Sequence, residues 1–288
     1  MFSQKFFNHQ IDIALSSAPI IDSAHHQRIV IFSDCHRGSG NWSDSFLPNK
    51  TIYEAALTYY FNNGFTYIEL GDGDELWENR NFTDIAEIHS DTFRLLERFA
   101  DAGRMFIIWG NHDRVKSRNF RYGFTALPAA HEGLIIRCSS TPGHGSYHLI
   151  HGHQADPLNN QFWKIARWLV RYIWRPLELS GFKDPTSTAK NYDKGKIVEQ
   201  RLLTWCRTNS VSLVAGHTHR PVLAGFQSDN SNTHRWRYCN TGSCIHPNTI
   251  TCIEMDHGNI SLIKWATCAD ASQYIHVCRH IIGGQYEM

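Results

Sequence analysis

Five short apolar segments, each followed at once by a cluster of polar residues, constrain the fold of this chain more than any other feature. Their Ile, Val, Phe and Tyr content, and their Gly, Asn and Asp boundaries, are typical of strands buried on both faces. Residues two apart on a strand point the same way, so an H-x-H cluster directs both rings to one side. The segments are R-I-V-I-F-S-D-C-H (28–36), F-T-Y-I-E-L-G-D (65–72), M-F-I-I-W-G-N-H-D (105–113), Y-H-L-I-H-G-H (147–153) and S-L-V-A-G-H-T-H (212–219).

Helical patterns fill the gaps between the first three strands. Residues 51–64 have helical periodicity and stop at Gly64, and residues 84–103 stop at Gly103. The second helix is expected to bury one apolar face, formed by Ile85, Ile88, Phe93, Leu96 and Phe99. Alternation of strands and helices predicts a layered α/β domain.

Short strands separated by turns dominate the C-terminal part. Residues 234–243, 249–255 and 259–266 have this pattern, with turns at N-T-G-S and D-H-G-N. They predict a β-meander that closes a second sheet against the first. The chain has no internal repeat, low-complexity tract or linker, so we expect one domain over residues 1–288.

Charge and hydropathy exclude several classes of function. The 28 basic and 27 acidic residues nearly cancel, so we expect no specific binding of nucleic acid. The N-terminus lacks the apolar core of a signal peptide and no segment is apolar enough to span a bilayer, which predicts a cytoplasmic protein.

The eight cysteines form no C-x-x-C motif. Reduced thiols are expected, with adventitious metal ligation or pairing under oxidation as alternatives.

Potential metal ligands follow every one of the five strands. In open α/β sheets, ligands gather at the carboxyl ends of strands. Carboxylate, imidazole and amide donors together suit Mn²⁺, Fe²⁺ or Zn²⁺. The set is too large for one tetrahedral ion and fits two ions roughly 3.5–4 Å apart. Its members are Asp34, His36, Asp72, Asn111, His112, Asp113, His151, His217 and His219.

These clusters resemble, in the same order, the five signature blocks of the calcineurin-like metallophosphoesterases. The blocks are D-x-H (34–36), G-D-x-x-E (71–75), G-N-H-D (110–113), H (151) and G-H-x-H (216–219). The resemblance implies a four-layer α/β/β/α sandwich of two mixed sheets flanked by helices. It also implies a helical insertion, here residues 154–206, between the fourth and fifth blocks.

The resemblance also implies a role for each matching residue. A hydroxide bridging two divalent ions would attack a phosphoester or pyrophosphate in line, because metal binding lowers the pKa of water from 15.7 to roughly 7. Mn²⁺ is the expected ion, with Fe or Zn²⁺ as alternatives. His112 would protonate the leaving oxygen or stabilise the pentacoordinate state, and Asp113 would orient its ring. The implied ligands are Asp34, His36 and His219 for one ion, Asn111, His151 and His217 for the other, and Asp72 bridging both.

Each residue also has an ordinary structural interpretation. Asp34 and Asp72 could be helix N-caps, Asn111 a turn former and His151 a surface histidine. The ordinary interpretation of all seven ligands requires seven unrelated coincidences, so we favour the metal site. Cys35 lies between two ligands and would point to the opposite face, into the core.

Substrate choice depends on residues outside the five blocks. G-D-G-D-E-L-W (71–77), G-H-T-H-R-P (216–221) and the insertion resemble UDP-2,3-diacylglucosamine pyrophosphatases, which implies a lipid-linked or nucleotide diphosphate. The chain departs from that pattern with H-G-H-Q-A-D (151–156) in place of H-G-D, and with Gly73-Asp74 in place of an apolar pair. Three arginines follow ligand blocks: Arg37, Arg80 and Arg114. They are candidates for binding the phosphate of the substrate, or else they are ordinary surface charges.

A basic amphipathic helix is expected at residues 161–176, in which Lys164, Arg167, Arg171 and Arg175 line one face. It could cap the substrate as a lid, lie with its arginines in solvent, or contact an anionic membrane peripherally.

Three rival functions remain open: a phosphatase-like phosphomonoesterase, a non-catalytic metal-binding scaffold on the same fold, and a mononuclear zinc regulator. The complete ligand set argues against the scaffold, and the missing C-x-x-C argues against the regulator.

Overall fold

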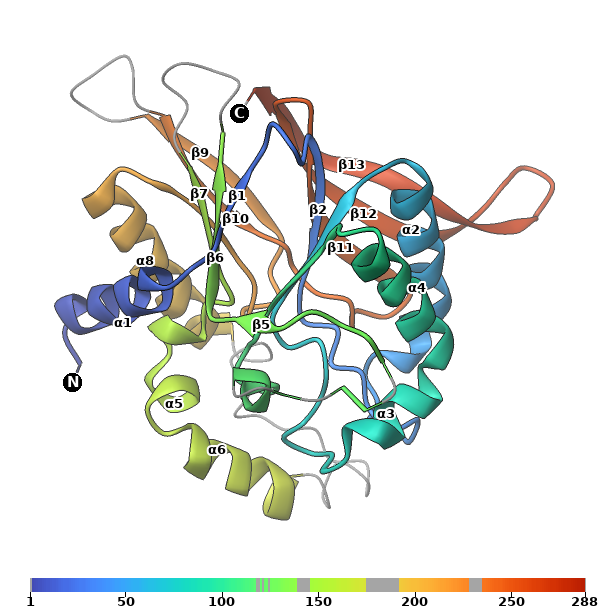
Figure 1. Ribbon diagram of the computed structural model, residues 1–288, viewed down its shortest axis with the longest axis horizontal. Helices are drawn as coiled ribbons and strands as arrows, with labels where there is room; N and C mark the ends of the chain where they lie inside the picture. Colours follow the sequence, from blue (N-terminus) through green and yellow to red (C-terminus); the bar gives the residue numbers. More distant parts are fainter. Residues whose placement is uncertain are drawn as a thin grey trace.

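Two β-sheets pack face to face and helices cover both outer surfaces, which gives four layers (Figure 1). The computed structural model describes residues 2–117, 120, 122–123, 125–138, 146–174, 192–227 and 235–287. Helices α2 (Lys50–Asn62), α3 (Phe82–Ile88) and α4 (Ser90–Asp101) lie on one side, and α1 (Gln4–Ser16) and α8 (Tyr192–Asn209) on the other. The predicted sandwich of two mixed sheets is confirmed.

The first sheet has the strand order β13-β12-β11-β2-β3-β4-β5 within the described residues. β2, β3, β4 and β5 run parallel, whereas β11, β12 and β13 extend the sheet in antiparallel fashion. The strands are β2 (Arg28–Phe32), β3 (Thr66–Leu70), β4 (Met105–Ile108), β5 (Ala130–His131), β11 (Thr249–Asp256), β12 (Asn259–Ala269) and β13 (Ile275–Glu287).

The second sheet has the order β1-β6-β7-β8-β10-β9 in the same part of the chain. Its β7, β8 and β10 run parallel, and β6 and β9 are antiparallel to their neighbours β7 and β10. The strands are β1 (Ile20–Asp22), β6 (Gly133–Arg137), β7 (Tyr147–Ile150), β8 (Ser212–Ala215), β9 (Val222–Gln227) and β10 (Arg235–Asn240).

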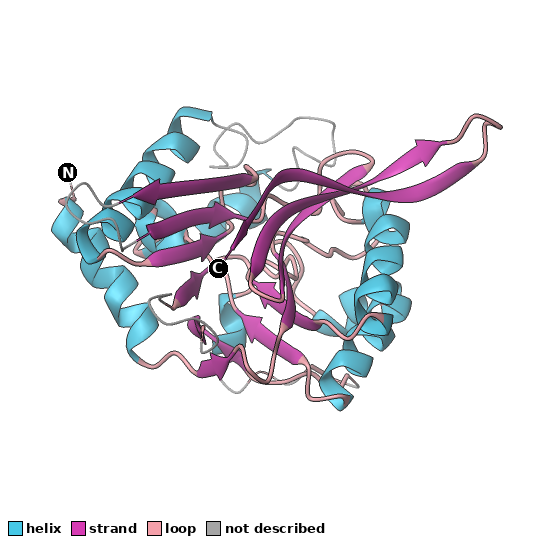
Figure 2. Cartoon of the chain, turned by 90° about the horizontal axis from the view of Figure 1, so that it is seen from above, coloured by secondary structure: helices cyan, strands magenta, loops and turns pink. Residues whose placement is uncertain are grey.

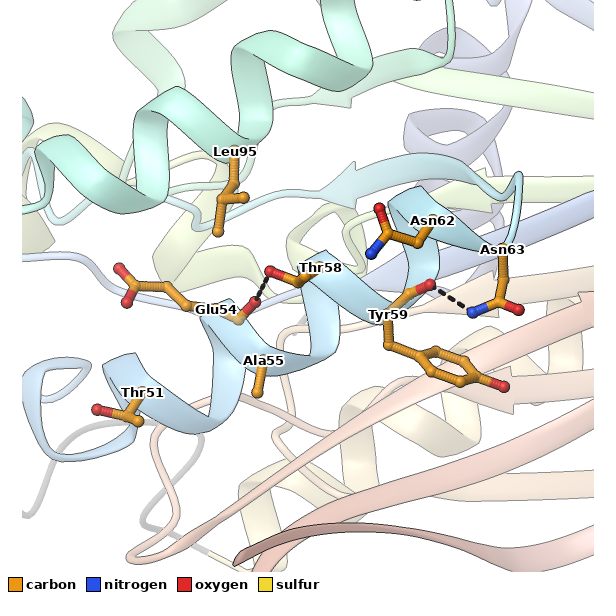
Figure 3. A pocket seen from close by; sticks show the side chains of 8 residues that line it. All are labelled: Thr51, Glu54, Ala55, Thr58, Tyr59, Asn62, Asn63 and Leu95. Atoms are coloured by element: carbon orange, nitrogen blue, oxygen red, sulfur yellow. Dashed lines mark hydrogen bonds between the residues drawn. The ribbon is translucent and has the colours of Figure 1, made fainter.

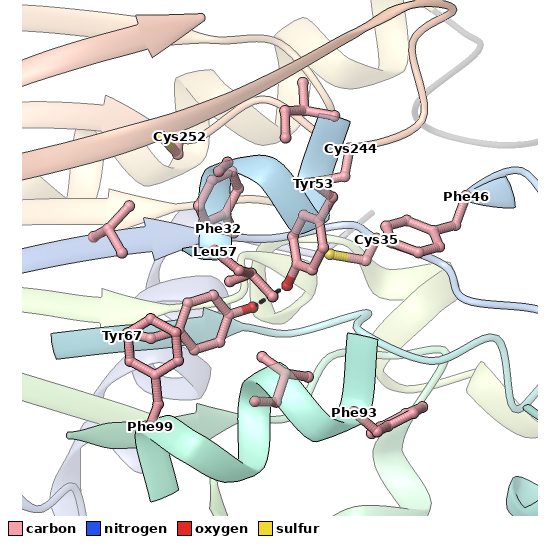
Figure 4. Close-up of a cluster of buried hydrophobic side chains, with 14 of the residues drawn as sticks. Phe32, Cys35, Phe46, Tyr53, Leu57, Tyr67, Phe93, Phe99, Cys244 and Cys252 are labelled. Carbon is pink, nitrogen blue, oxygen red and sulfur yellow. Dashed lines mark hydrogen bonds between the residues drawn. The ribbon is translucent and has the colours of Figure 1, made fainter. Parts of the chain in front are cut away.

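The core explains why the first strands are continuously apolar. Val30 and Phe32 pack under α2 and α4, whereas the alternate residues Ile29 and Ile31 pack between the sheets. Both faces of β2 are therefore buried, so polar and apolar residues do not alternate along this strand. Cys35 joins the first of these clusters, which confirms its predicted place in the core (Figure 4).

The five predicted strands all form, but they divide between two sheets. The first three are β2, β3 and β4, and the other two are β7 and β8 of the second sheet. The predicted C-terminal meander is wrong in one respect: β10 pairs with β8, and only β11, β12 and β13 form a continuous antiparallel run. The meander extends the sheet of β2 instead of closing a separate one.

The predicted helix over residues 84–103 consists of two helices. α3 ends at Ile88 and α4 begins at Ser90. The intervening His89 leaves the helical conformation, with φ −103° and ψ 28°, and its ring pairs with Asp44 at 2.9 Å. Ile88, predicted to be buried, is 44% exposed, whereas the other four predicted residues of the apolar face are buried. α1, β1, β5, β6, β9 and β13 were not expected from the sequence.

The insertion begins with α5 (Pro157–Asn160), α6 (Trp163–Leu169) and a π-helical turn over Val170–Trp174. Arg175, the last member of the predicted basic face, and the predicted end of that helix lie outside the described residues. No helix among the described residues is long and apolar enough to cross a bilayer.

A shallow surface hollow lies along α2, between Thr51 and Asn63, and is closed on one side by Leu95 of α4 (Figure 3). Its polar side chains already have partners: the Thr58 hydroxyl donates to the Glu54 carbonyl, the Asn63 amide donates to the Tyr59 carbonyl, and the Glu54 carboxylate accepts from the Thr92 hydroxyl of α4. The hollow therefore lacks convergent polar groups directed at a ligand.

Candidate metal centre

The ligand clusters of both sheets meet beyond the ends of their strands. Backbone hydrogen bonds continue past β2 and β3, with Asp34 N donating to Gly71 O and His36 N to Asp72 O. Gly216 N likewise donates to His151 O in the second sheet. These bonds hold the polar clusters in register after the regular strands have ended.

Five of the seven predicted ligands have left-handed backbone conformations. Their φ angles are +53° at Asp34, +50° at His36, +51° at Asp72, +66° at His217 and +56° at His219. A non-glycine residue in this region costs of order 1–3 kcal/mol, and such residues concentrate at functional sites. The local strain turns each side chain out of its strand direction and toward the others.

The predicted ligands form two adjoining groups. Asp34, His36 and His219 offer donor atoms within 4.8 Å of one another, and Asp72, His151 and His217 do the same. His219 Nε2 lies 3.0 Å from Asp34 Oδ1, and His151 Nε2 lies 3.1 Å from Asp72 Oδ2. His36 Nε2 lies 3.9 Å from Asp34 Oδ1 and 3.8 Å from Asp72 Oδ2, so it connects the groups. The grouping matches the two-ion prediction, whose assignment of individual ligands stays a prediction.

Asn111 Oδ1 is buried and makes no hydrogen bond to the described residues, and the buried atoms Asp34 Oδ1 and His151 Nε2 are approached only by other members of the cluster. A buried polar atom without a partner costs about 1–3 kcal/mol, so such atoms are rare unless something binds them. Oxygen and imidazole donors in this state suit a borderline divalent ion. The residues present therefore fit the metal ions that the sequence predicts.

Each carboxylate uses one oxygen to hold the fold and leaves the other toward the cluster. Asp34 Oδ2 accepts from His217 N and from the Ser33 hydroxyl, whereas Oδ1 faces His219 and His36. Asp72 Oδ1 accepts from His112 N at 2.8 Å, whereas Oδ2 faces His151 and His36. This division orients one oxygen of each carboxylate before any ion binds.

Glycine is required where ligands lie against the backbone of another block. A Cβ on Gly110 would come 2.2 Å from Asp72 Oδ1, and one on Gly216 would come 2.4 Å from Ser33 Oγ. Gly71 has φ +84° and contacts the His151 ring, so both conformation and space exclude a side chain there. The glycines of the sequence blocks therefore allow strands of the two sheets to converge.

The carboxylates and imidazoles shift one another's pKa values. Burial alone would lower the pKa of His36, but the hydrogen bond with Glu75 and the charges of Asp72 and Asp34 raise it to about 10. Burial would raise the pKa of Asp34, but His219 and His151 lower it to about 2. Imidazole must be neutral to bind a metal, so an ion that enters this centre releases protons, and its affinity falls as the pH falls.

His112 lies at the rim of the cluster. Its side chain is 21% exposed, and the ring stacks on Trp77 at 4.2 Å between centroids. Nδ1 donates to Glu75, which leaves Nε2 as the ring atom available to a substrate. Burial would lower the pKa of His112, but the charges of Glu75 and Asp72 raise it, so the ring favours its protonated form.

Asp113 does not orient the ring of His112, and that prediction is wrong. Its carboxylate instead accepts hydrogen bonds from the backbone N–H groups of Gly110, Asp72 and Gly73, and from the Lys116 ammonium at 2.7 Å. Asp113 therefore fastens the second block to the third. Its side chain points inward because the turn after β4 brings it over those amides.

Glu75 performs the role that the sequence assigned to Asp113. Its carboxylate contacts His112 Nδ1 at 2.7 Å and His36 Nδ1 at 2.9 Å, so it orients both rings. The signal was available as the last residue of G-D-x-x-E, but spacing alone did not connect it to a histidine 37 residues away. Asp156 was also missed: it lies 3.3 Å from His217 Nε2 and ends the unusual H-G-H-Q-A-D stretch.

If His112 acts as the predicted acid, replacement of Glu75 with glutamine should weaken hydrolysis. The neutral amide no longer raises the pKa of His112, so the His112 ring loses its proton at a lower pH. The alkaline limb of the pH–rate profile should therefore move to lower pH. Glu54→Gln on α2 should leave the profile unchanged, and an unshifted limb in Glu75→Gln would contradict this role.

The three arginines proposed to grip phosphate lie in different places. Arg37 is fully buried and donates to Glu69 and Asp74, each at 2.7 Å, so it cannot reach a substrate and that prediction is wrong. Arg80 donates to the Tyr172 hydroxyl, and Arg114 donates to Asn160 while its guanidinium lies over Trp109 and Trp163. Both therefore contact the insertion.

A comparison with protein families covers the same blocks of sequence. The family model described as calcineurin-like phosphoesterase matches residues 27–221, which include all five blocks. No curated protein sequence matches the chain. Similar solved structures include Vps29 from Cryptosporidium parvum, with 12% identity, TM-score 0.40 and coverage of 91% of this chain and 98% of that one.

Two further structures are similar at the same level. Vps29 from Chaetomium thermophilum has 11% identity, TM-score 0.42 and coverage of 91% and 97% of the two chains. A dimetal phosphatase from Danio rerio has 10% identity, TM-score 0.44 and coverage of 82% and 94%. The family match spans more than half of the sequence and contains every residue of the two ligand groups. This chain therefore belongs to the calcineurin-like phosphoesterase family.

Proposed function

We propose that the protein is a hydrolase that uses two divalent metal ions to cleave the phosphoester or pyrophosphate bond of an amphipathic, nucleotide- or lipid-linked diphosphate. The observation that carries the chemistry is the pair of adjoining ligand groups, whose buried Asp34 Oδ1, Asn111 Oδ1 and His151 Nε2 make no hydrogen bond outside the cluster. When bound, two such ions lower the pKa of water and neutralise charge on the phosphate. Mn²⁺ is the ion we expect, and Fe and Zn²⁺ suit the same donors.

The chain's own residues supply the remaining parts of the reaction. His112 favours the protonated state and leaves Nε2 at the rim of the centre, which suits it to donate a proton to the leaving oxygen. Glu75 keeps that ring in place through Nδ1. Trp77 stacks on the same ring and limits its rotation.

An apolar surface on the insertion supports the choice of substrate. Phe162, Ile165, Trp168 and Tyr172 are each 46–56% exposed, and we call them the apolar face. Arg171 donates to the carbonyls of Trp77 and Leu76, and Tyr172 accepts from Arg80, so the insertion is tied to the loop that contacts His112. A diphosphate at the metals could therefore lay an apolar group along this face.

Arg171 is not a free phosphate-binding group, because it is used to hold the insertion. The predicted cap thus has an apolar surface and an anchored arginine, and its role as a lid stays part of this proposal. Peripheral contact with an anionic membrane is the competing proposal for residues 161–176, of which the structure describes 161–174. Vesicle sedimentation separates the two, since a cap needs no bilayer.

The test compares hydrolysis of three substrates by the metal-loaded protein: p-nitrophenyl phosphate, bis-p-nitrophenyl phosphate and a UDP-linked acyl sugar. Metal content is measured by mass spectrometry on the same sample. About two ions per chain and preference for the acylated diphosphate would support the proposal. Preference for the monoester would favour a phosphomonoesterase. Bound metal without turnover of any substrate would favour a non-catalytic scaffold.

Shortening the apolar face should affect amphipathic substrates selectively. The double substitution Trp168→Ala/Tyr172→Ala should raise KM for the acylated diphosphate about tenfold or more, because burial of one large apolar side chain contributes about 1.5–3 kcal/mol. The rate with bis-p-nitrophenyl phosphate should not change. Trp42→Ala is the control, since Trp42 is 96% exposed. Equal loss with both substrates would show that the face acts on the site's structure instead.

A further inference from the structure

A long β-hairpin formed by β12 and β13 projects beyond the body of the protein (Figure 2). Residues 269–276, which contain its turn, are all exposed. A two-stranded ribbon with neither face packed on a core is marginally stable in water. Beyond Val277, which still packs against the core, a cross-link between the strands would therefore stabilise this ribbon.

Two cysteines and two histidines lie on one face of this ribbon near its turn. Cys268 on β12 is the Cα partner of His276 on β13, and Cys278 and His280 follow His276 at intervals of two. Because alternate residues of a strand share a face, all four side chains point the same way. The sulfur and nitrogen donors of Cys268, Cys278 and His280 lie within 4.8 Å of one another.

The distances suit ligands of a single ion. Cys268 Sγ lies 3.4 Å from His280 Nε2, and Cys278 Sγ lies 3.2 Å from His276 Nε2. Ligands placed at about 2.0–2.3 Å from a tetrahedral zinc are separated by roughly 3.3–3.8 Å. His276 Nδ1 also lies 3.4 Å from the Tyr274 carbonyl, which leaves Nε2 free for the cluster.

The structure joins Cys268 and Cys278 in a disulfide, whereas the other six cysteines of the sequence are free. The disulfide corrects, for this pair, the expectation of reduced thiols, and it matches the alternative of pairing under oxidation. A disulfide needs only two cysteines, however, and gives no role to the two imidazoles beside them. Two thiolates and two imidazoles are a characteristic tetrahedral zinc set.

We propose that the thiol form of this hairpin binds one Zn²⁺ through Cys268, Cys278, His276 and His280. An external dithiol that reduces the disulfide supplies two electrons and two protons and is itself oxidised to a disulfide. Zinc then replaces the two thiol protons, which leave to solvent, and the neutral imidazoles complete the site. The ion clips the two strands together near the turn.

The test uses Co²⁺ in place of Zn²⁺ on the reduced, full-length protein. Thiolate-to-cobalt charge transfer distinguishes this site from the candidate metal centre, whose predicted donors are nitrogen and oxygen. Reduced wild-type protein should show the absorption, Cys268→Ser/Cys278→Ser should lose it, and His276→Ala/His280→Ala should weaken it. Wild-type protein should also bind one more Zn²⁺ per chain than the serine variant.

His25→Ala is the matched control, since it removes an exposed histidine elsewhere and should change nothing. Zinc should also slow proteolysis of residues 269–276 in the reduced wild type but not in the serine variant. The proposal is overturned if reduced wild-type protein shows no charge transfer and the same zinc content as the serine variant. It is equally overturned if the absorption persists in the serine variant, because other cysteines then bind the cobalt.

Discussion

Replacement of His112 with alanine is expected to lower kcat about 10²–10⁴-fold, the usual contribution of a general acid, while the protein keeps its metal ions. The reason is geometric: His112 contacts Glu75 and Trp77, its side chain is partly exposed, and its Nδ1 is occupied, so Nε2 is the ring atom left to meet a bound substrate. The neighbouring His36 is almost fully buried by contrast. Steady-state kinetics and metal analysis of one preparation check the expectation.

A substrate with a good leaving group provides a second readout for His112. Protonation matters less when the leaving oxygen is a weak base, so His112→Ala should lose less activity with p-nitrophenyl esters than with alkyl esters. His148→Ala, in β7 and bonded to Ser212 O, is the matched control. Loss of metal from His112→Ala would show that the ring is needed for binding ions, and the assignment as an acid would fail.

Replacement of Lys116 with methionine is expected to destabilise the protein by about 3–5 kcal/mol, as found when one partner of a buried ion pair is removed. The Lys116 ammonium is fully buried and lies 2.7 Å from both Asp74 and Asp113 and 3.5 Å from Glu69. Without it, Arg37 remains as the cation bonded to Glu69 and Asp74. The remaining negative charge is left uncompensated in the interior.

The same change should reduce metal binding at a distance. Asp113 holds the backbone of Gly110, Asp72 and Gly73, so a displaced Asp113 would loosen the block that carries the predicted bridging carboxylate.

Urea unfolding of the metal-free protein isolates the stability effect of Lys116→Met. Lys50→Met is the control: its ion pairs are 3.8 Å long and partly exposed, so it should cost less than about 1 kcal/mol. A comparably small effect at Lys116 would refute the structural role of the network.

The buried network also predicts how stability depends on acid. Burial would raise the pKa of Asp74, but Arg37 and Lys116 lower it to about 2 from 3.8. A carboxylate with a depressed folded-state pKa stabilises the protein fully above the unfolded value and loses that contribution as the pH falls through the folded value. The free energy of unfolding should therefore decline between about pH 4 and pH 2, and less so in Asp74→Asn.

Much of the candidate site could be predicted because its residues are local extensions of buried strands. The apolar runs that become β2, β3, β4, β7 and β8 have a clear composition, and the polar residues directly after them had to lie at strand ends. Six of the seven predicted ligands accordingly lie in two adjoining groups, and the seventh, Asn111, offers a buried oxygen from the third block. The resemblance to a known family added the roles, which spacing alone could not assign.

The errors concern residues whose partners are distant in the sequence. Arg37 follows a ligand block and has the composition of a phosphate-binding group, yet it turns inward to Glu69 and Asp74. Asp113 adjoins His112, yet Glu75 contacts the ring and Asp113 binds backbone amides. Cys268, His276, Cys278 and His280 received no joint role, because only the register of β12 with β13 places them on one face.

The sequence by itself therefore determined the five buried strands that end in polar clusters, the residues of those clusters and the chemistry that those residues share. Periodicity and strand boundaries report burial and direction over a few neighbouring residues, and that information is present in the chain's own order. The tertiary structure alone decided how the strands divide between two sheets, which carboxylate holds which ring, and which arginine is buried. Those outcomes depend on strand pairing and on contacts between residues tens of positions apart, which no local pattern records.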